Sequence, residues 1–406
     1  MSMKIKAAVL VSSFAVLLFV VVGSLGGVHA SSNDGAYQQM QVYSEVLSRV
    51  QNEYVVDPDI PKVTDGALHG LLESLDPNSA YLTPEAYKAY KAHKAEGKGE
   101  IGATISKRFG YADVVSVLAG SPADKAGIED TDIFESIEGK STRDMSLPEI
   151  RAALEGPAGS TVSVSVVRAR RAEPEKMSIA RAIVSIPPVS DKIMEDGVGY
   201  IKADALPKGE SEEIAARIKS LEKQGAKRLV LDLRDTSEGE ESEGIATANL
   251  FLNHGTITYL QGQKYPRQAF NADPAKAITS LPLAVLVNKG TAGAAEVVAA
   301  AILENARGDV VGDKTFGAGS VQKTIDLPDG GALILSVAKY YSPSGKAIQD
   351  TAVTPNVLVA DASDNIISDD DGEEPATTEQ PAEAKPKNTP DDQLQKAIEI
   401  LKSRAS

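Results

Sequence analysis

Residues 288–322 have the layout of a catalytic loop, but its two central positions carry no reactive side chain. The apolar run at 281–287 is typical of a buried strand, and the Ala- and Val-rich run at 294–303 favours a buried helix. The turn Gly-Thr-Ala-Gly joins them, so backbone amides at the helix start are free there, as at many nucleophile and anion sites. The residue at this junction is Gly293, which has no nucleophile.

The segment resembles the carboxyl-terminal processing (tail-specific) proteases, a bacterial and plastid serine peptidase family with an embedded PDZ domain. Members read G-[ST]-A-S-A-S-E and then T-F-G-K-G-x-V-Q. The resemblance implies that the middle Ser is the nucleophile and that the Lys is its general base. This chain reads GTAGAAE at 290–296 and TFGAGSVQ at 315–322, with the interval between the motifs kept.

Carried over by position, the resemblance places Gly293 where the nucleophile belongs and Ala318 where the general base belongs. Gln322 matches a supporting Gln that orients the Lys, and it is retained. A Ser/Lys dyad needs a hydroxyl to attack and a desolvated amine to accept its proton. Neither group is present at these positions.

A third departure lies after the apolar run 229–234, which ends in Asp-Leu-Arg as in the family. The family continues with N-P-G-G, which implies a glycine amide in the oxyanion hole. Here the continuation is DTSEGEE at 235–241, with three Glu. Carboxylates beside a developing oxyanion oppose it. The three departures together predict a protein that does not cleave peptide bonds.

A relocated pair is the alternative, an active serine-type endopeptidase with a different nucleophile and base. The residues in or beside the motifs that could form it are Ser320, Thr291, Lys314, Lys323 and Lys289. Ser320 fills a position that the family leaves variable, and Lys289 and Lys323 are expected to be solvated. The sequence therefore favours the inactive interpretation.

Other catalytic chemistries find little support in the sequence. His29, His69, His93 and His254 have no HExxH or paired-ligand spacing, and there is no Cys. No phosphate-binding P-loop or G-x-G-x-x-G motif is present. We therefore expect no metal and no cofactor.

Residues 99–184 resemble a PDZ domain. Gly99, Ile101, Gly102 and Ala103 match its carboxylate-binding loop, whose amides hold a peptide C-terminus. The segment 119–128 matches the turn and helix that follow in such domains, and residues 146–149 have capping-box spacing before a helix. We expect a peptide to bind as an added strand beside residues 103–107.

The remaining chain predicts the elements around these loops. Residues 31–98 read as a helical region, with a turn at Asp76-Pro77. Residues 185–360 alternate strands and helices, which predicts a layered α/β core, and the resemblance implies a crotonase-like, ClpP-like protease core. The fold class is therefore α/β multidomain, with N-terminal helices, a PDZ domain and this core.

The residues at the two ends of the chain predict export and a C-terminal helix joined to the body by a linker. Lys4 and Lys6 precede an apolar run at 7–22, so residues 1–30 read as a secretory signal, with an inner-membrane anchor through 7–22 as the alternative. Residues 361–390 form an acidic, Pro-containing linker that we expect to be disordered. Residues 391–406 return to helical spacing, and this tail is expected to dock on the body or on a second copy.

Composition agrees with a soluble envelope protein. The net charge of −15 argues against nucleic acid and other anionic partners. We therefore expect an exported protein, in the periplasm or cell envelope, that binds the C-termini of proteins through its PDZ domain. An active protease homologue and a second copy of the chain are further candidate partners.

Overall fold

The computed structural model describes residues 34–93, 99–108, 110–168, 173–360 and 391–403. The chain forms two compact units that divide after Ala67. The predicted signal or anchor and the acidic linker lie outside the described residues. No helix within the described ranges combines the length and the apolar character that a membrane crossing requires.

The first unit holds helix α2 (Asp34–Glu53) and the start of α3 (Ile60–Glu73). The predicted helical spacing is confirmed in α2, where Arg49 pairs with Glu45 at 2.8 Å and with Glu53 at 3.2 Å. Val42 and Val46 of the same helix are exposed.

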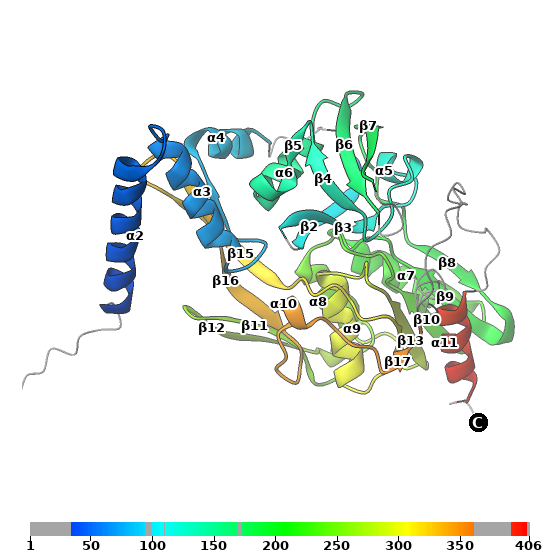
Figure 1. The fold of residues 1–406 in the computed structure, drawn as a ribbon. Helices are drawn as coiled ribbons and strands as arrows, with labels where there is room; N and C mark the ends of the chain where they lie inside the picture. Colours follow the sequence, from blue (N-terminus) through cyan, green and yellow to red (C-terminus); the bar gives the residue numbers. More distant parts are fainter. Residues whose placement is uncertain (1–33, 94–98, 109, 169–172, 361–390, 404–406) are drawn as a thin grey trace, which may run out of the picture. The chain divides into compact units, whose positions relative to one another are not determined.

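The α/β core of the second unit is a six-stranded sheet, as the alternating pattern predicted (Figure 1). Its strands in spatial order are β17 (Val357–Leu358), β14 (Asp309–Gly312), β13 (Leu283–Val287), β10 (Arg228–Asp232), β9 (Val198–Lys202) and β8 (Ser190–Ile193). All neighbours are parallel except β8 and β9.

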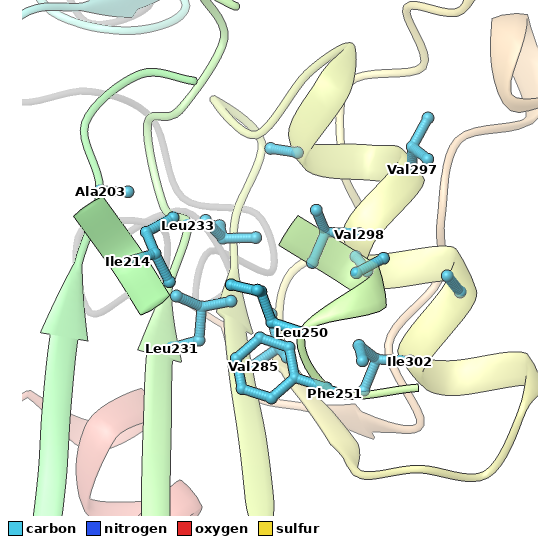
Figure 2. Close-up of a cluster of buried hydrophobic side chains, with 14 of the residues drawn as sticks. Ala203, Ile214, Leu231, Leu233, Leu250, Phe251, Val285, Val297, Val298 and Ile302 are labelled. Carbon is cyan, nitrogen blue, oxygen red and sulfur yellow. The ribbon is translucent and has the colours of Figure 1, made fainter. Parts of the chain in front are cut away.

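The two faces of this sheet are covered by different helices, because side chains alternate along a strand. Leu229 and Leu231 face α7 (Glu210–Lys223), α8 (Glu241–Asn249) and α9 (Ala294–Glu304) in the main core. Figure 2 shows Leu231, Val285 and Val298 converging there. Val230, Ala284 and Leu286 face the other way, against α11 (Asp392–Ser403).

The C-terminal helix thus docks on the body of the same chain, one of the two outcomes that the sequence left open. Ala397 and Leu401 are fully buried on the sheet. Arg234 fixes the start of the helix, since its guanidinium donates to Asp391 at 2.8 and 2.9 Å and also pairs with buried Asp232.

A second, antiparallel sheet borders the core. Its strands are β1 (Ala80–Leu82), β16 (Ala332–Tyr341), β11 (Thr256–Gly262) and β12 (Tyr265–Asn271), with β15 (Ser320–Asp326) also paired to β16. The predicted turn before β1 is confirmed, because Asp76 Oδ1 accepts from the amides of Asn78 and Ser79, both at 2.8 Å. Helix α4 (Pro84–His93) covers β1 through Tyr87.

The predicted PDZ segment is a separate small sheet in the order β2-β3-β4-β6-β7. Its elements are β2 (Ala103–Arg108), β3 (Tyr111–Val117), α5 (Pro122–Lys125), β4 (Ile133–Ile137), β5 (Lys140–Ser141), α6 (Leu147–Leu154), β6 (Thr161–Val167) and β7 (Glu175–Ala180). The predicted helix start is confirmed, since Glu149 accepts from the Ser146 amide at 2.8 Å. Strand β2 lies at one edge of this sheet.

Candidate functional site

The predicted strand–turn–helix junction is formed by β13, residues 288–293 and α9. Asn288 organises the turn, because its Oδ1 accepts from the amides of Asp235 at 2.9 Å and Gly290 at 3.1 Å. Its Nδ2 donates to Asp235 Oδ1 at 2.7 Å. The loop after β10 and the start of α9 are therefore held side by side.

Gly293 occupies the sharp point of the junction as the N-cap of α9. Its backbone angles are φ 60° and ψ −121°, a conformation that side chains rarely adopt. A Cβ at this position would meet open space, since the nearest atom is the Ser237 carbonyl oxygen at 3.9 Å. The backbone thus has the sharp geometry of a nucleophile turn, with glycine relieving its strain.

Glu296, one turn into α9, joins the two sequence motifs. Its carboxylate is fully buried and accepts four hydrogen bonds. Oε2 accepts from the amides of Gly293 at 3.1 Å and Ala318 at 2.7 Å. Oε1 accepts from the Gly317 amide at 2.8 Å and from the Thr315 hydroxyl. The structure therefore brings Gly293 and Ala318 together, because their amides converge on one oxygen atom.

Burial destabilises the negative charge of this carboxylate more than its hydrogen bonds stabilise it. Burial raises the pKa of Glu296 to about 7, although the four hydrogen bonds act to lower it. All four donors serve the ionised form, and a buried charge without a cation is costly. Glu296 is therefore a titratable group, near neutral pH, at the meeting point of both motifs.

The loop after β10 is bound to the PDZ-like sheet. Ser237 Oγ donates to Thr104 Oγ1 at 2.6 Å and shares a hydrogen bond with Ser116. Thr104 Oγ1 donates to Glu238 Oε1 at 2.8 Å. Strand β2 and the Glu-rich loop are consequently linked by a chain of hydroxyls that ends on a carboxylate.

Gln322 lies on β15, where its side chain is exposed. Its Nε2 donates to Ser320 Oγ at 2.7 Å and to the Ser320 carbonyl at 3.1 Å. Asn78 Nδ2 also donates to Ser320 Oγ, at 3.1 Å. Gln322 Nε2 also donates to Ser336 Oγ at 3.4 Å, so Gln322 serves two hydroxyls and Ser320 Oγ receives two amide donors.

The other hydroxyls near the motifs have structural partners. Thr291 is fully buried, and its hydroxyl donates to the Leu233 carbonyl at 2.8 Å. Thr315 donates to Glu296 and accepts from the Val353 amide at 2.8 Å. The side chains of Lys289, Lys314 and Lys323 are exposed. Exposed amines are not desolvated, and a lysine general base requires desolvation.

The predicted carboxylate loop lies at the start of β2. The amides of Ile101 and Gly102 have no protein acceptor in the part of the chain that the structure describes. Gly102 has φ +73°, and a Cβ there would lie 2.4 Å from the Ser121 Cβ. Ile101 is buried in the small domain's core, which fixes the loop. Successive free amides of this kind form an anion-binding nest.

Burial also raises the pKa of Glu100 within this loop, and the negative charges of Glu238 and Glu155 raise it further. Gly99 forms backbone hydrogen bonds with Gly156, at 2.7 and 2.9 Å, that close the base of the loop. The four predicted loop residues are therefore brought together, with an acidic group beside them.

The sequence did not identify Glu296, Thr104 or Ser237 as site residues. Glu296 is the last residue of the first motif, so its place in that motif was the one sequence feature that could have marked it as a site residue. The pairing of Thr104 with Ser237 joins residues far apart in the chain and left no local signal. Among the described residues, no three carboxylate or imidazole groups gather into a metal site.

The chain is similar in sequence to known peptidases and to PDZ domains. Residues 197–359 match the model of peptidase family S41, and residues 114–168 match the PDZ domain model. The chain is 31% identical to the carboxy-terminal-processing protease of Bartonella bacilliformis, over 81% of this chain and 77% of that one. It is 32% identical to a carboxy-terminal processing protease of Bacillus subtilis, over 84% and 73% respectively.

A solved structure agrees with these sequence matches. The photosystem II D1 C-terminal processing protease superposes with a TM-score of 0.66 and 26% identity. The match covers 79% of this chain and 92% of that one. The predicted mixed α/β fold with a PDZ domain is confirmed by this match.

Proposed function

This chain belongs to peptidase family S41, the carboxyl-terminal processing proteases, and carries their PDZ domain, and we propose that it binds protein C-termini without cleaving them. In this role it is a regulator or binding scaffold, a pseudoenzyme built on a serine peptidase fold. The proposal assigns Gly293 to the nucleophile position and Ala318 to the general-base position.

One observation carries the proposal. The amides of Gly293 and Ala318 converge on Glu296 Oε2, which supports assigning these two residues to the paired positions of a dyad. Glycine and alanine supply neither a nucleophile nor a base. The nearby hydroxyls of Thr291 and Thr315 support the same conclusion, because both are committed to buried partners.

Retained peptide binding is supported by the carboxylate loop. The free amides of Ile101 and Gly102 suit a terminal carboxylate, and β2 offers an edge for an added strand. The partners are thus proteins with accessible C-termini. An active homologue whose substrates it shares, or a second copy of the chain, is a further candidate.

We place this function outside the cytoplasm, in the periplasm or cell envelope. The support is the signal-like sequence of residues 1–30, and the alternative is anchoring to the inner membrane through residues 7–22. The relatives named above include processing proteases of bacteria.

The test uses the purified chain and an unfolded substrate that ends in an apolar residue. We expect binding without cleavage, and we expect amidation of the substrate's C-terminus to abolish binding. Fragment analysis by mass spectrometry and fluorescence anisotropy measure the two outcomes. Turnover that disappears in Ser320→Ala or Lys314→Ala would instead establish an active endopeptidase with a relocated catalytic pair.

A further inference from the structure

The free edge of β2 carries one side chain that an incoming strand must displace. Arg151, on α6, reaches across to β2 and donates from Nη2 to the Ile105 carbonyl at 3.3 Å. Arg151 is exposed, and in the described part of the chain its guanidinium forms no ion pair. An arginine in this position occupies a backbone acceptor of the edge while its charge remains unmatched.

The alternation of β2 identifies which peptide residue meets this arginine. The Gly102 carbonyl accepts from Leu118 at 2.9 Å, on the β3 side, whereas the Ile105 carbonyl points to α6. The polar groups of Ala103 and Ile105 therefore face outward. With a terminal carboxylate on the Ile101 and Gly102 amides, the last peptide residue pairs with Ala103. The residue two before it then pairs with Ile105.

Directly opposed residues of an antiparallel pair place their side chains on the same face. The Ile105 side chain is buried against Leu147, Ile150 and Leu154 of α6. The third-last peptide side chain consequently also lies against α6, beside the origin of Arg151. Lys107, the next cation along β2, is already committed to Glu73 at 2.7 Å and to the Met145 carbonyl at 2.9 Å.

We propose that Arg151 closes the β2 edge in the free protein and selects C-terminal peptides with an acidic third-last residue. The peptide amide replaces the guanidinium on the Ile105 carbonyl, and the released guanidinium pairs with the peptide's Asp or Glu side chain. This inference rests on the proposed binding of C-termini, and it adds the chemistry of the sequence that is bound. In a chain of net charge −15 such a preference needs a local cation.

The experiment measures affinity of the full chain for labelled ten-residue peptides by fluorescence anisotropy. The peptides share an apolar terminal residue and differ only in a Glu, Gln or Lys at the third-last position. The wild type should bind the Glu peptide about fivefold more tightly than the Gln peptide, as expected for one partly exposed ion pair. Lys should weaken binding further.

Arg151→Ala should bind Glu and Gln peptides equally, and the Gln peptide at least as tightly as the wild type does, because the edge is open. Arg151→Glu should prefer the Lys peptide. Lys140→Ala removes the same charge from exposed β5 and should keep the wild-type preference. A purely structural role for Arg151 would weaken all peptides alike.

Equal affinity of the wild type for the Glu and Gln peptides overturns the inference, and this comparison needs no variant. A Glu peptide with an amidated C-terminus tests the proposed binding of C-termini separately from the role of Arg151. If amidation leaves affinity unchanged, the proposed binding of C-termini fails. If amidation abolishes binding while Glu and Gln remain equal, only the role of Arg151 fails.

Discussion

At the scale of single residues, Glu296 is the group that holds the candidate site together. It accepts from both motif loops, so their relative position depends on one buried carboxylate. The two positions proposed for the dyad contribute only backbone amides to this arrangement. Both motifs therefore have a structural role of their own, because they fold against each other.

The raised pKa of Glu296 predicts a pH-dependent stability. The value is about 7 in the folded protein and about 4.5 in the unfolded chain, so the folded state binds the proton more tightly. The stabilisation is complete below pH 4.5 and is lost as pH rises through 7, by about 3 kcal/mol in total. Urea denaturation at pH 5 and pH 8 measures this change.

The variant Glu296→Gln cannot titrate, so the difference in unfolding free energy between wild type and variant should shift by about 2.5 kcal/mol between pH 5 and pH 8, which is most of that total. Glu212→Gln removes one exposed negative charge and serves as the control. A difference between the wild type and the Glu296→Gln variant that stays constant from pH 5 to pH 8 would contradict the assignment.

Glu100 predicts a second effect, on binding. Its raised pKa means that the proton is retained to higher pH than in an ordinary Glu, and an ionised Glu100 repels a peptide carboxylate nearby. Affinity for C-terminal peptides should therefore increase as pH falls. Glu100→Gln should bind about threefold more tightly at pH 7.5 and lose most of this pH dependence. Anisotropy titrations at several pH values test both statements, and unchanged affinity in the variant would refute them.

At the scale of elements, the strands with continuous apolar runs were predictable and the edge pairings were not. The runs at 229–234 and 281–287 predicted β10 and β13 within two residues at each end, because strands buried on both faces have an unambiguous composition. Helix α9 was predicted by its Ala- and Val-rich run, which is buried along almost its whole length.

The hairpin β11–β12 was not predicted, since β12 exposes nearly all of its side chains and shows no buried face. Strand β1 has three residues and pairs with β16, some 250 positions along the chain. Helix α8 ends at Asn249, and residues 250–252 leave the helix to pack into the core. Long-range strand pairing and core packing determine these elements, and neither leaves a local pattern in the sequence.

The docking of α11 gives an element-scale prediction. Leu401 is fully buried against the sheet face formed by Val230, Ala284 and Leu286. Leu401→Ala should reduce the free energy of unfolding by about 3 kcal/mol, through lost burial and the cavity that remains. Urea denaturation measures this loss.

Glu399→Ala, on the exposed side of the same helix, should change stability by no more than about 0.5 kcal/mol. Equal, small effects of the two substitutions would mean that α11 does not stay on the sheet. The intramolecular site would then be open to a second copy, the other outcome that the sequence allowed.

At the scale of the whole molecule, the PDZ domain and the Glu-rich loop are in direct contact. The contacts of Thr104 with Ser237 and Glu238 put β2 beside the loop that follows β10. If peptides bind along β2 as proposed, binding also acts on this loop. The effect of the loop on catalysis then determines whether the dyad alone can restore activity.

The double variant Gly293→Ser with Ala318→Lys supplies the missing hydroxyl and amine. Space for the serine exists, since the nearest atom to its Cβ is 3.9 Å away, although its backbone conformation costs about 1–2 kcal/mol. Three features oppose turnover: the Ser237 carbonyl faces the serine, Glu238 adds negative charge, and Gln322 is bound to Ser320. Cleavage of an unfolded substrate should therefore stay below about a hundredth of the rate of the Bacillus subtilis relative, the cost of a lost oxyanion donor.

Adding Glu238→Gly to the double variant tests which feature limits the reaction. Removing this carboxylate takes one negative charge from the loop, while Thr104 still accepts from Ser237 and the contact with β2 is kept. We expect the rate to rise at least about tenfold, whereas Glu240→Gly in the same background, which removes an equal charge two residues away, should leave it unchanged. Rapid cleavage by the double variant alone would mean that the loop is harmless, and that the loss of two side chains is sufficient to explain an inactive protein.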